Sequence, residues 1–139
     1  MENIDISVLI KMSSLILDKY ANQLLAPYDL TGSQFRILIL LYQSPSGNIR
    51  QIDIENEFLM TNPTVTGLVQ KLEQKGLIDR IMNPEDKRSK VLVLTERAME
   101  MKEEILRLSA ELEQQMTTGL SQKECTQLRD LLTKILNSN

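Results

Sequence analysis

The segment that most constrains the fold follows residue 76, where two short apolar runs flank a charged stretch. Leu77 to Met82 and Val91 to Leu94 are rich in the residue types that favour strands. The eight residues between them, Asn83 to Lys90, are polar and include Pro84. This pattern predicts a two-stranded β-hairpin with a long charged tip.

Two short helices are predicted immediately before this hairpin. Arg50 to Phe58 fits the first, and after a brief break Thr61 can cap the second. Pro63 falls in the first turn of this second helix, where a missing N–H costs nothing, and Gly76 ends it. Its inward face would consist of Val65, Leu68, Val69 and Leu72. Its outward face would hold Thr64, Thr66, Gly67, Gln70, Lys71 and Gln74.

Two further helices are predicted nearer the N-terminus. Apolar residues at spacings of three and four indicate an amphipathic helix from Ile4 to Leu25, which ends near Pro27. Thr31 to Gln34 has the form of a capping box and opens a more fully buried helix over Phe35 to Tyr42. The turn residues Ser44 to Asn48 end that helix.

The chain after the hairpin is predicted to form two more helices. Thr95 can cap a long helix with near-heptad apolar spacing, which favours a helical partner. Its apolar positions are Ala98, Met101, Ile105, Leu108, Leu112 and Met116. A second capping box, Ser121 to Glu124, opens the last helix. All 139 residues fit the usual size of one domain.

Composition removes several function classes. The chain has no histidine, which is the commonest general base and a common zinc ligand, and no nucleophile and base pair or glycine-rich phosphate loop is recognisable. We therefore expect no enzyme, no metal and no cofactor. The single Cys125 cannot form an intramolecular disulfide, and the start of the chain lacks a secretion signal, so a cytosolic protein is expected. No apolar run is long enough to cross a membrane.

Charge is unevenly distributed along the sequence. The net charge is −3, yet residues 60–92 carry +2 between flanks of −3 and −2. Lys87, Arg88 and Lys90 lie within four positions of the hairpin tip. Two short helices followed by a hairpin with a basic tip define a winged helix-turn-helix. We therefore expect a mainly α fold with a small β-hairpin wing and long terminal helices, in which one helix reads the DNA major groove.

Three segments resemble the MarR family of bacterial regulators, named for multiple antibiotic resistance. Leu30 to Leu38 is similar to the opening of the family's second helix, and Pro63 to Ile78 is similar to its recognition helix. Asn83 to Glu96 is similar to its wing, with an Asn-Pro-Glu-Asp-Lys-Arg tip that runs into a strand and then Leu-Thr-Glu. The resemblance extends over essentially the whole chain.

The resemblance implies that particular side chains bind double-stranded DNA. Arg50 and Gln51 would lie near phosphates, and Asp86 would orient Arg88 toward the minor groove. The side chains facing the major groove would be Thr61, Asn62, Thr64, Thr66, Gln70 and Lys71. Those approaching the backbone from the wing would be Lys87, Ser89 and Lys90.

The resemblance also implies an assembly and a mode of regulation. Residues 1–28 and 96–139 would form dimerisation helices around a winged lobe at 31–95, giving a homodimer that is most often a repressor on a pseudo-palindromic operator. In relatives, small aromatic effectors bind between the dimer helices and the lobe. Here Met12, Ile16, Phe35 and Ile39 would line that cleft, or would equally be filled core. Redox sensing by Cys125 is not expected, because family sensors place their cysteine in the first helix.

This chain departs from the family pattern at three positions. Gly67 stands where many relatives have a larger polar residue, so it either permits close approach or makes no base contact. Leu59 replaces a glycine of the helix–helix turn, and Glu55 replaces a small residue. Operator preference therefore does not transfer from relatives. The alternative function is a winged-helix module that binds another protein and not DNA. This alternative would agree with the negative net charge of the chain.

The seven methionines are predicted to be packing residues and not a ligand or redox site. Four of them lie on or beside predicted apolar helix faces. These are Met12, Met99, Met101 and Met116.

Overall fold

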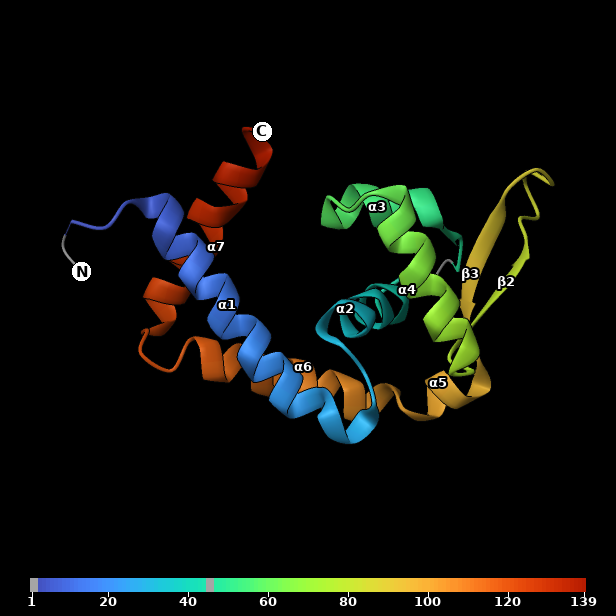
Figure 1. Ribbon diagram of the computed structural model, residues 1–139, viewed down its shortest axis with the longest axis horizontal. Helices are drawn as coiled ribbons and strands as arrows, with labels where there is room; N and C mark the ends of the chain where they lie inside the picture. Colours follow the sequence, from blue (N-terminus) through green and yellow to red (C-terminus); the bar gives the residue numbers. More distant parts are fainter. Residues whose placement is uncertain (1–2, 45–46) are drawn as a thin grey trace.

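A computed structural model describes residues 3–44 and 47–139 and shows a mainly helical chain with one small sheet (Figure 1). In chain order the elements are α1 (Ile6–Leu25), the 3₁₀ turn η1 (Ala26–Tyr28), α2 (Gly32–Tyr42), β1 (Ile49–Arg50), α3 (Gln51–Phe58), α4 (Asn62–Gln74), β2 (Ile78–Met82), β3 (Lys90–Leu94), α5 (Glu96–Glu100), α6 (Lys102–Met116) and α7 (Gln122–Asn137). This confirms the predicted fold class. The predicted turn at 44–48 lies partly outside the described residues.

Side-chain caps begin most of these helices at the predicted positions. Thr31 and Ser121 each start a complete capping box, in α2 and α7 respectively. Thr61 caps α4 by accepting from the Thr64 N–H, and Thr95 caps α5 in the same way. Because each cap joins residues three apart, the sequence alone was sufficient to locate these helix starts.

The sheet has three strands, not the two predicted. β3 is central, with β2 antiparallel on one side, in register from Ile78 opposite Leu94 to Met82 opposite Lys90. On the other side β1 pairs Ile49 with Leu92 and Arg50 with Val91. The prediction missed β1 because its two residues show no periodicity, and only a partner more than 40 residues away makes them a strand.

The predicted single helix after Thr95 is divided at Met101. The Ala98 carbonyl accepts the buried Tyr42 hydroxyl at 2.5 Å and also the Met101 N–H at 3.2 Å. The second of these is a tight, 3₁₀-type bond. A side chain that enters the hydrogen-bond ladder in this way interrupts a regular helix. A tertiary contact therefore separates α5 from α6.

The core joins the helices to the sheet. Its fully buried members come from α1 to α6 and from both hairpin strands. Examples are Ile37, Leu38, Ile54, Val65, Val69, Leu72, Ile78, Leu92 and Ile105. This packing fixes α4 against α2 and the sheet, so that its polar face remains outside.

The terminal helices form an arm on the opposite side of the molecule from the hairpin (Figure 1). α1 packs along α6, with Ala21 and Leu25 in the core, whereas α7 buries none of its residues. The methionine prediction was wrong for Met12, Met82 and Met99, which are 39%, 61% and 49% exposed, because none of these side chains faces the core of this chain. In the described residues no helix is long and apolar enough to cross a bilayer.

Candidate nucleic-acid interface

The central element of the candidate site is α4. Val65, Val69 and Leu72 are completely buried and fix this helix against the lobe. The side chains of Thr64, Gln70 and Lys71 are exposed on the other side, and that of Thr66 is half-buried. α4 therefore presents hydroxyl, amide and cationic groups of the kind that hydrogen-bond to base edges and phosphates.

Side-chain hydrogen bonds fix the N-terminal end of α4 to α3. The Gln51 amide donates to the Thr66 hydroxyl at 2.7 Å, and the Asn62 amide donates to the Glu55 carboxylate at 3.2 Å. The Thr61 hydroxyl donates to that of Thr64 at 2.9 Å. Two helices linked in this way move as a unit, so their outward groups keep a fixed spacing.

A charged pair marks the start of α3. The Arg50 guanidinium donates to Asp53 at 3.0 and 3.3 Å, and the Arg50 backbone N–H donates to the same carboxylate at 2.8 Å. The side-chain hydrogen bond lowers the pKa of Asp53 and raises that of Arg50. Arg50 is therefore a fixed, fully charged group at the edge of the sheet.

The wing tip is a compact turn that leaves the Arg88 side chain exposed to solvent. The Asn83 amide donates to the Ser89 hydroxyl at 3.0 Å, and the Ser89 N–H donates to the Asp86 carbonyl at 3.1 Å. Asp86 also accepts the Arg88 N–H at 3.0 Å and lies 3.6 Å from its guanidinium. The Arg88 side chain is 95% exposed. Asp86 thus contacts Arg88 without burying it.

A groove of about 400 Å³ lies between α3, the start of α4 and the sheet. Five of the residues singled out in the sequence line it, namely Arg50, Gln51, Asn62, Ser89 and Lys90. Lys87, Arg88 and Asp86 lie beyond it in the wing, and Gln70 and Lys71 lie further along α4.

Sequence reasoning missed Arg80 as a residue of this groove and noted Glu55 only as a departure from the family pattern. Arg80, on β2, lies at the groove with its guanidinium 2.8 Å from Glu73, and Glu55 accepts from Asn62. The position of Arg80 within a predicted strand was the available signal, but the groove itself depends on how β2 pairs with β3 and packs against α4. Within the described chain no group of three or more Cys, Asp or Glu residues is arranged to hold a metal ion.

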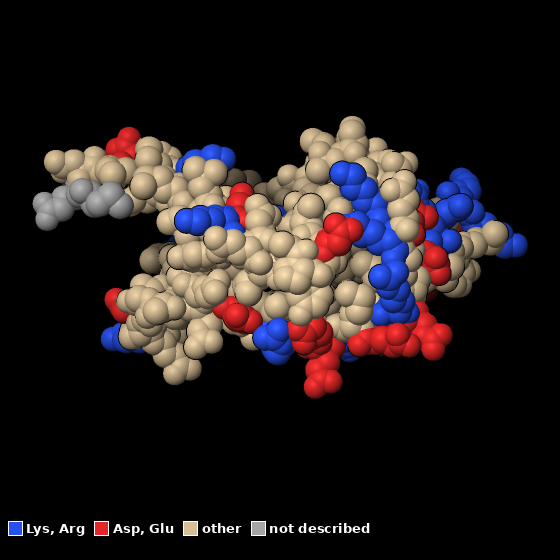
Figure 2. All heavy atoms as spheres, turned by 60° about the horizontal axis from the view of Figure 1, so that its bottom comes forward, with Lys and Arg blue, Asp and Glu red and all other residues tan. Residues whose placement is uncertain are grey.

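The surface charge agrees with this placement. Figure 2 shows many of the Lys and Arg side chains gathered in the half of the molecule that carries the hairpin, next to an acidic patch, while scattered charged groups of both signs lie toward the opposite end. A chain with net charge −3 therefore still presents a local cationic surface.

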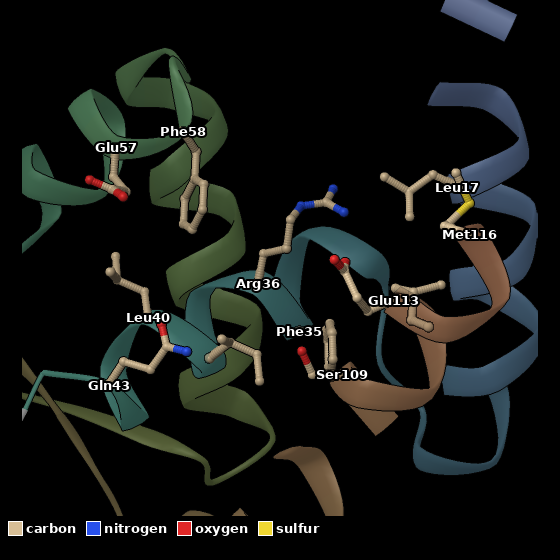
Figure 3. A pocket seen from close by; sticks show the side chains of 12 residues that line it. Leu17, Phe35, Arg36, Leu40, Gln43, Glu57, Phe58, Ser109, Glu113 and Met116 are labelled. Atoms are coloured by element: carbon tan, nitrogen blue, oxygen red, sulfur yellow. The ribbon is translucent and has the colours of Figure 1, made fainter. Parts of the chain in front are cut away.

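A second cleft, of about 250 Å³, lies between the arm and the lobe (Figure 3). Phe58 and Leu40 lie on one side, Leu17 and Met116 on the other, and Arg36 extends between them. Its remaining lining residues are Phe35, Ile39, Gln43, Glu57, Ser109, Leu112 and Glu113.

Two of the four residues expected in an effector cleft line this one. Phe35 and Ile39 do so, with Phe35 almost fully buried. Met12 and Ile16 do not line it and are 39% and 46% exposed on α1. Leu17 is the α1 residue that lines the cleft. Met12 and Ile16 lie on other sides of the same helix, so their side chains do not reach the cleft.

These elements define a winged helix-turn-helix protein: α3 and α4 form the helix pair and β2–β3 the wing. The MarR family model matches residues 30–90. The multiple antibiotic resistance protein MarR of Salmonella typhimurium is 31% identical over 136 residues, which are 97% of this chain and 93% of that protein. The chain belongs to the MarR family of transcriptional regulators.

Two solved structures have closely similar folds. A Staphylococcus aureus MepR–DNA complex superposes with a TM-score of 0.88 at 33% identity, covering 99% of this chain and 100% of that one. A mutant MarR from Escherichia coli, complexed with operator DNA, has a TM-score of 0.84 at 29% identity, covering 97% and 96% of the two chains.

Proposed function

We propose that this protein is a cytoplasmic, homodimeric repressor that binds a pseudo-palindromic operator in double-stranded DNA. The observation that carries the proposal is the placement of the exposed polar face of α4 beside a groove with Arg50 and Lys90 and a wing tip with Arg88. The similarity to MepR and MarR structures that contain DNA supports it. The proposed activity is binding, with no catalytic step.

The wing and α4 have different tasks in this proposal. α4 enters the major groove, where Thr64, Thr66 and Gln70 read base edges. Arg88 enters the adjacent minor groove, whose narrow and strongly negative A·T-rich segments attract a guanidinium. Arg50 and Lys90 neutralise phosphates, and each such contact steepens the salt dependence of binding.

Dimerisation is supported by the uncovered apolar face of α7. Leu128, Leu131 and Ile135 recur at helical spacing on α7 and are 42–60% exposed. Ile6 and Val8 at the start of α1 are 71% and 45% exposed. An apolar helix face of this kind needs a partner, and a two-fold dimer would match a two-fold operator with half-sites roughly 34–36 Å apart.

We further propose that a small aromatic effector binds in the cleft between arm and lobe. Phe35 and Phe58 provide aromatic surface there, and Arg36 and Gln43 provide polar groups. The cleft contacts α1 and α6 from the arm and α2 and α3 from the lobe. An occupant would therefore bias the distance between the two recognition helices of a dimer, and with it operator affinity.

A fluorescence-anisotropy titration tests the proposal. The probe is duplex DNA from immediately upstream of this protein's own gene, measured at two salt concentrations beside a random duplex of equal length. We expect Arg88→Ala to weaken binding about tenfold and to lower the salt slope by about one, because the protein loses one cation placed in the minor groove between the two phosphate backbones. Adding phenol to the wild-type titration tests for effector release.

Lys123→Ala is the matched control, because Lys123 is an exposed cation on α7, outside the interface. It should leave affinity unchanged. If the upstream and random duplexes bind equally well, a selection from random oligonucleotides is needed to find whether the protein prefers any sequence. If that selection enriches nothing and the protein does not bind DNA at low salt, the alternative is supported, namely a winged-helix module that binds another protein.

A further inference from the structure

No contact within the described chain explains why residue 67 of α4 is a glycine. It is the sixth of the thirteen residues of α4, in the helix interior. A glycine in a helix interior is unfavourable relative to alanine, because it gives up more backbone freedom on folding. Some other requirement must therefore favour glycine at this position.

Backbone conformation is not that requirement. Gly47 and Gly76 have φ values of +67° and +73°, a region that L side chains rarely adopt, whereas Gly67 has an ordinary helical conformation. Any residue can adopt the backbone geometry of Gly67.

Internal packing is not the requirement either. A Cβ placed on Gly32 would lie 3.4 Å from the Arg36 guanidinium and 3.6 Å from the Ala21 side chain. A Cβ placed on Gly67 meets nothing within 4 Å. The protein fold itself therefore has room for a side chain at Gly67.

The position of Gly67 indicates what the open space serves. Gly67 is two residues from both Val65 and Val69, so at 3.6 residues per turn it faces away from the side that these two bury. Its neighbours three and four residues along the helix are Thr64, Gln70 and Lys71. The bare backbone thus lies in the middle of the exposed face, framed by longer polar side chains.

We propose that Gly67 is a specificity-determining residue that lets the backbone of α4 lie directly against the bases of the operator. This inference rests on the proposed function. With no side chain at the centre of the face, Gln70 and Lys71 reach deeper into the major groove than they would past a Cβ. A methyl group at position 67 would hold the helix away from the bases, while contacts from the wing to phosphates would remain.

The test compares wild-type protein with Gly67→Ala on a duplex that the wild type selects from a random-sequence pool. We expect Gly67→Ala to bind this duplex about tenfold more weakly, while its affinity for an unrelated duplex stays within twofold. Its Tm should rise by about 3 °C, because alanine favours the helix. A new selection with Gly67→Ala should change base preference only in the middle of each half-site.

Asn22→Ala is the matched control, because Asn22 is an exposed residue of α1 where alanine also favours the helix. It should raise Tm without weakening DNA binding. Equal affinity of Gly67→Ala and wild type for the selected duplex would overturn this inference and leave the proposed function intact. A lower Tm for Gly67→Ala would also overturn it, since the glycine would then serve the fold. A wild type that enriches no sequence would overturn both.

Discussion

At the scale of single residues, two non-glycine positions hold a left-handed backbone. Asp29, after the 3₁₀ turn that follows α1, has φ +53°, and Leu59, between α3 and α4, has φ +54°. Asp29 accepts from Lys75 through its carbonyl oxygen, and its carboxylate lies 3.6 Å from the same ammonium group. The Leu59 side chain is 78% exposed, so its burial contributes little stability to offset the cost of the left-handed backbone.

Leu59→Gly should therefore stabilise the protein. A left-handed conformation costs a non-glycine residue about 1–2 kcal/mol. Glycine avoids this cost but loses more backbone entropy on folding, so the net gain in the free energy of unfolding should be about 1 kcal/mol. Urea unfolding should show a higher midpoint with an unchanged slope.

Gly76→Ala provides the opposite control, since Gly76 has φ +73° at the end of α4 and should lose stability on gaining a side chain. An unchanged or lower midpoint for Leu59→Gly would show that the leucine contributes packing that its exposure does not reveal.

At the scale of elements, the turn between α1 and α2 is attached on both sides. The Tyr28 hydroxyl donates to Glu104 on α6, and the ammonium group of Lys75, just past α4, lies 3.1 Å from the Gln34 side-chain oxygen. The Tyr28–Glu104 contact holds the turn to the arm, and the Lys75–Gln34 contact links α2 to the end of α4. These polar contacts add to the apolar core contacts of α1 and α6 that join the arm to the lobe.

Glu104 gives the arm side of this turn a pH dependence. The Arg107 guanidinium donates to Glu104 at 2.6 and 3.3 Å, and together with the Tyr28 hydroxyl it lowers the pKa of Glu104 to about 2. Its value in an unfolded chain is about 4.3. The folded pKa is the lower one, so this contribution to stability is complete above about pH 4.3 and is lost as the pH falls toward 2.

Glu104→Gln should therefore lose less stability than wild type between about pH 4.5 and 2.5. Urea midpoints measured across this range would check this, with Glu103→Gln as the control on the same helix turn. Parallel pH profiles for wild type and Glu104→Gln would contradict the prediction, because they would mean that Glu104 titrates alike in the folded and unfolded chains.

At the scale of the whole molecule, an arm with exposed apolar side chains on α7 and a lobe with exposed polar and cationic side chains lie at opposite ends. The arm ends in α7, which is capped at its start yet buries none of its residues in this chain. The lobe carries the groove and the wing. In the proposed function, association would use one end of the protein and DNA binding the other, so that assembly would set the distance between the two copies of α4.

Leu132→Glu tests the role of the arm. Leu132 is 40% exposed on the apolar face of α7, and a carboxylate there would be desolvated by a partner. We expect the variant to have a mass near the 15.9 kDa of one chain in light scattering, whereas the wild type has twice that mass. Operator affinity should fall more than tenfold, since one half-site is then bound alone.

Thr133→Glu carries the same charge on the opposite side of α7 and should remain dimeric. A dimeric Leu132→Glu variant would place the association surface elsewhere on the chain.

Much of this architecture could be predicted because it depends on residues close together in sequence. The caps at Thr31, Thr61 and Ser121 each connect positions three apart. The contact between Asp86 and Arg88 spans two residues, and it fixes the wing tip locally. Helix spacing and strand runs are equally local, so the order of elements and the positions of the basic tip and polar helix face followed from sequence alone.

What the tertiary structure decided depends on partners far apart in the chain. β1 is a strand only because β3 pairs with it, and the break at Met101 exists only because Tyr42 reaches the Ala98 carbonyl. Arg80 lines the groove only because β2 pairs with β3 and packs against α4, and the helical phase of α1 places Leu17, and not Met12, at the cleft. Such contacts depend on how whole elements pack, and no local pattern in the sequence encodes their distances.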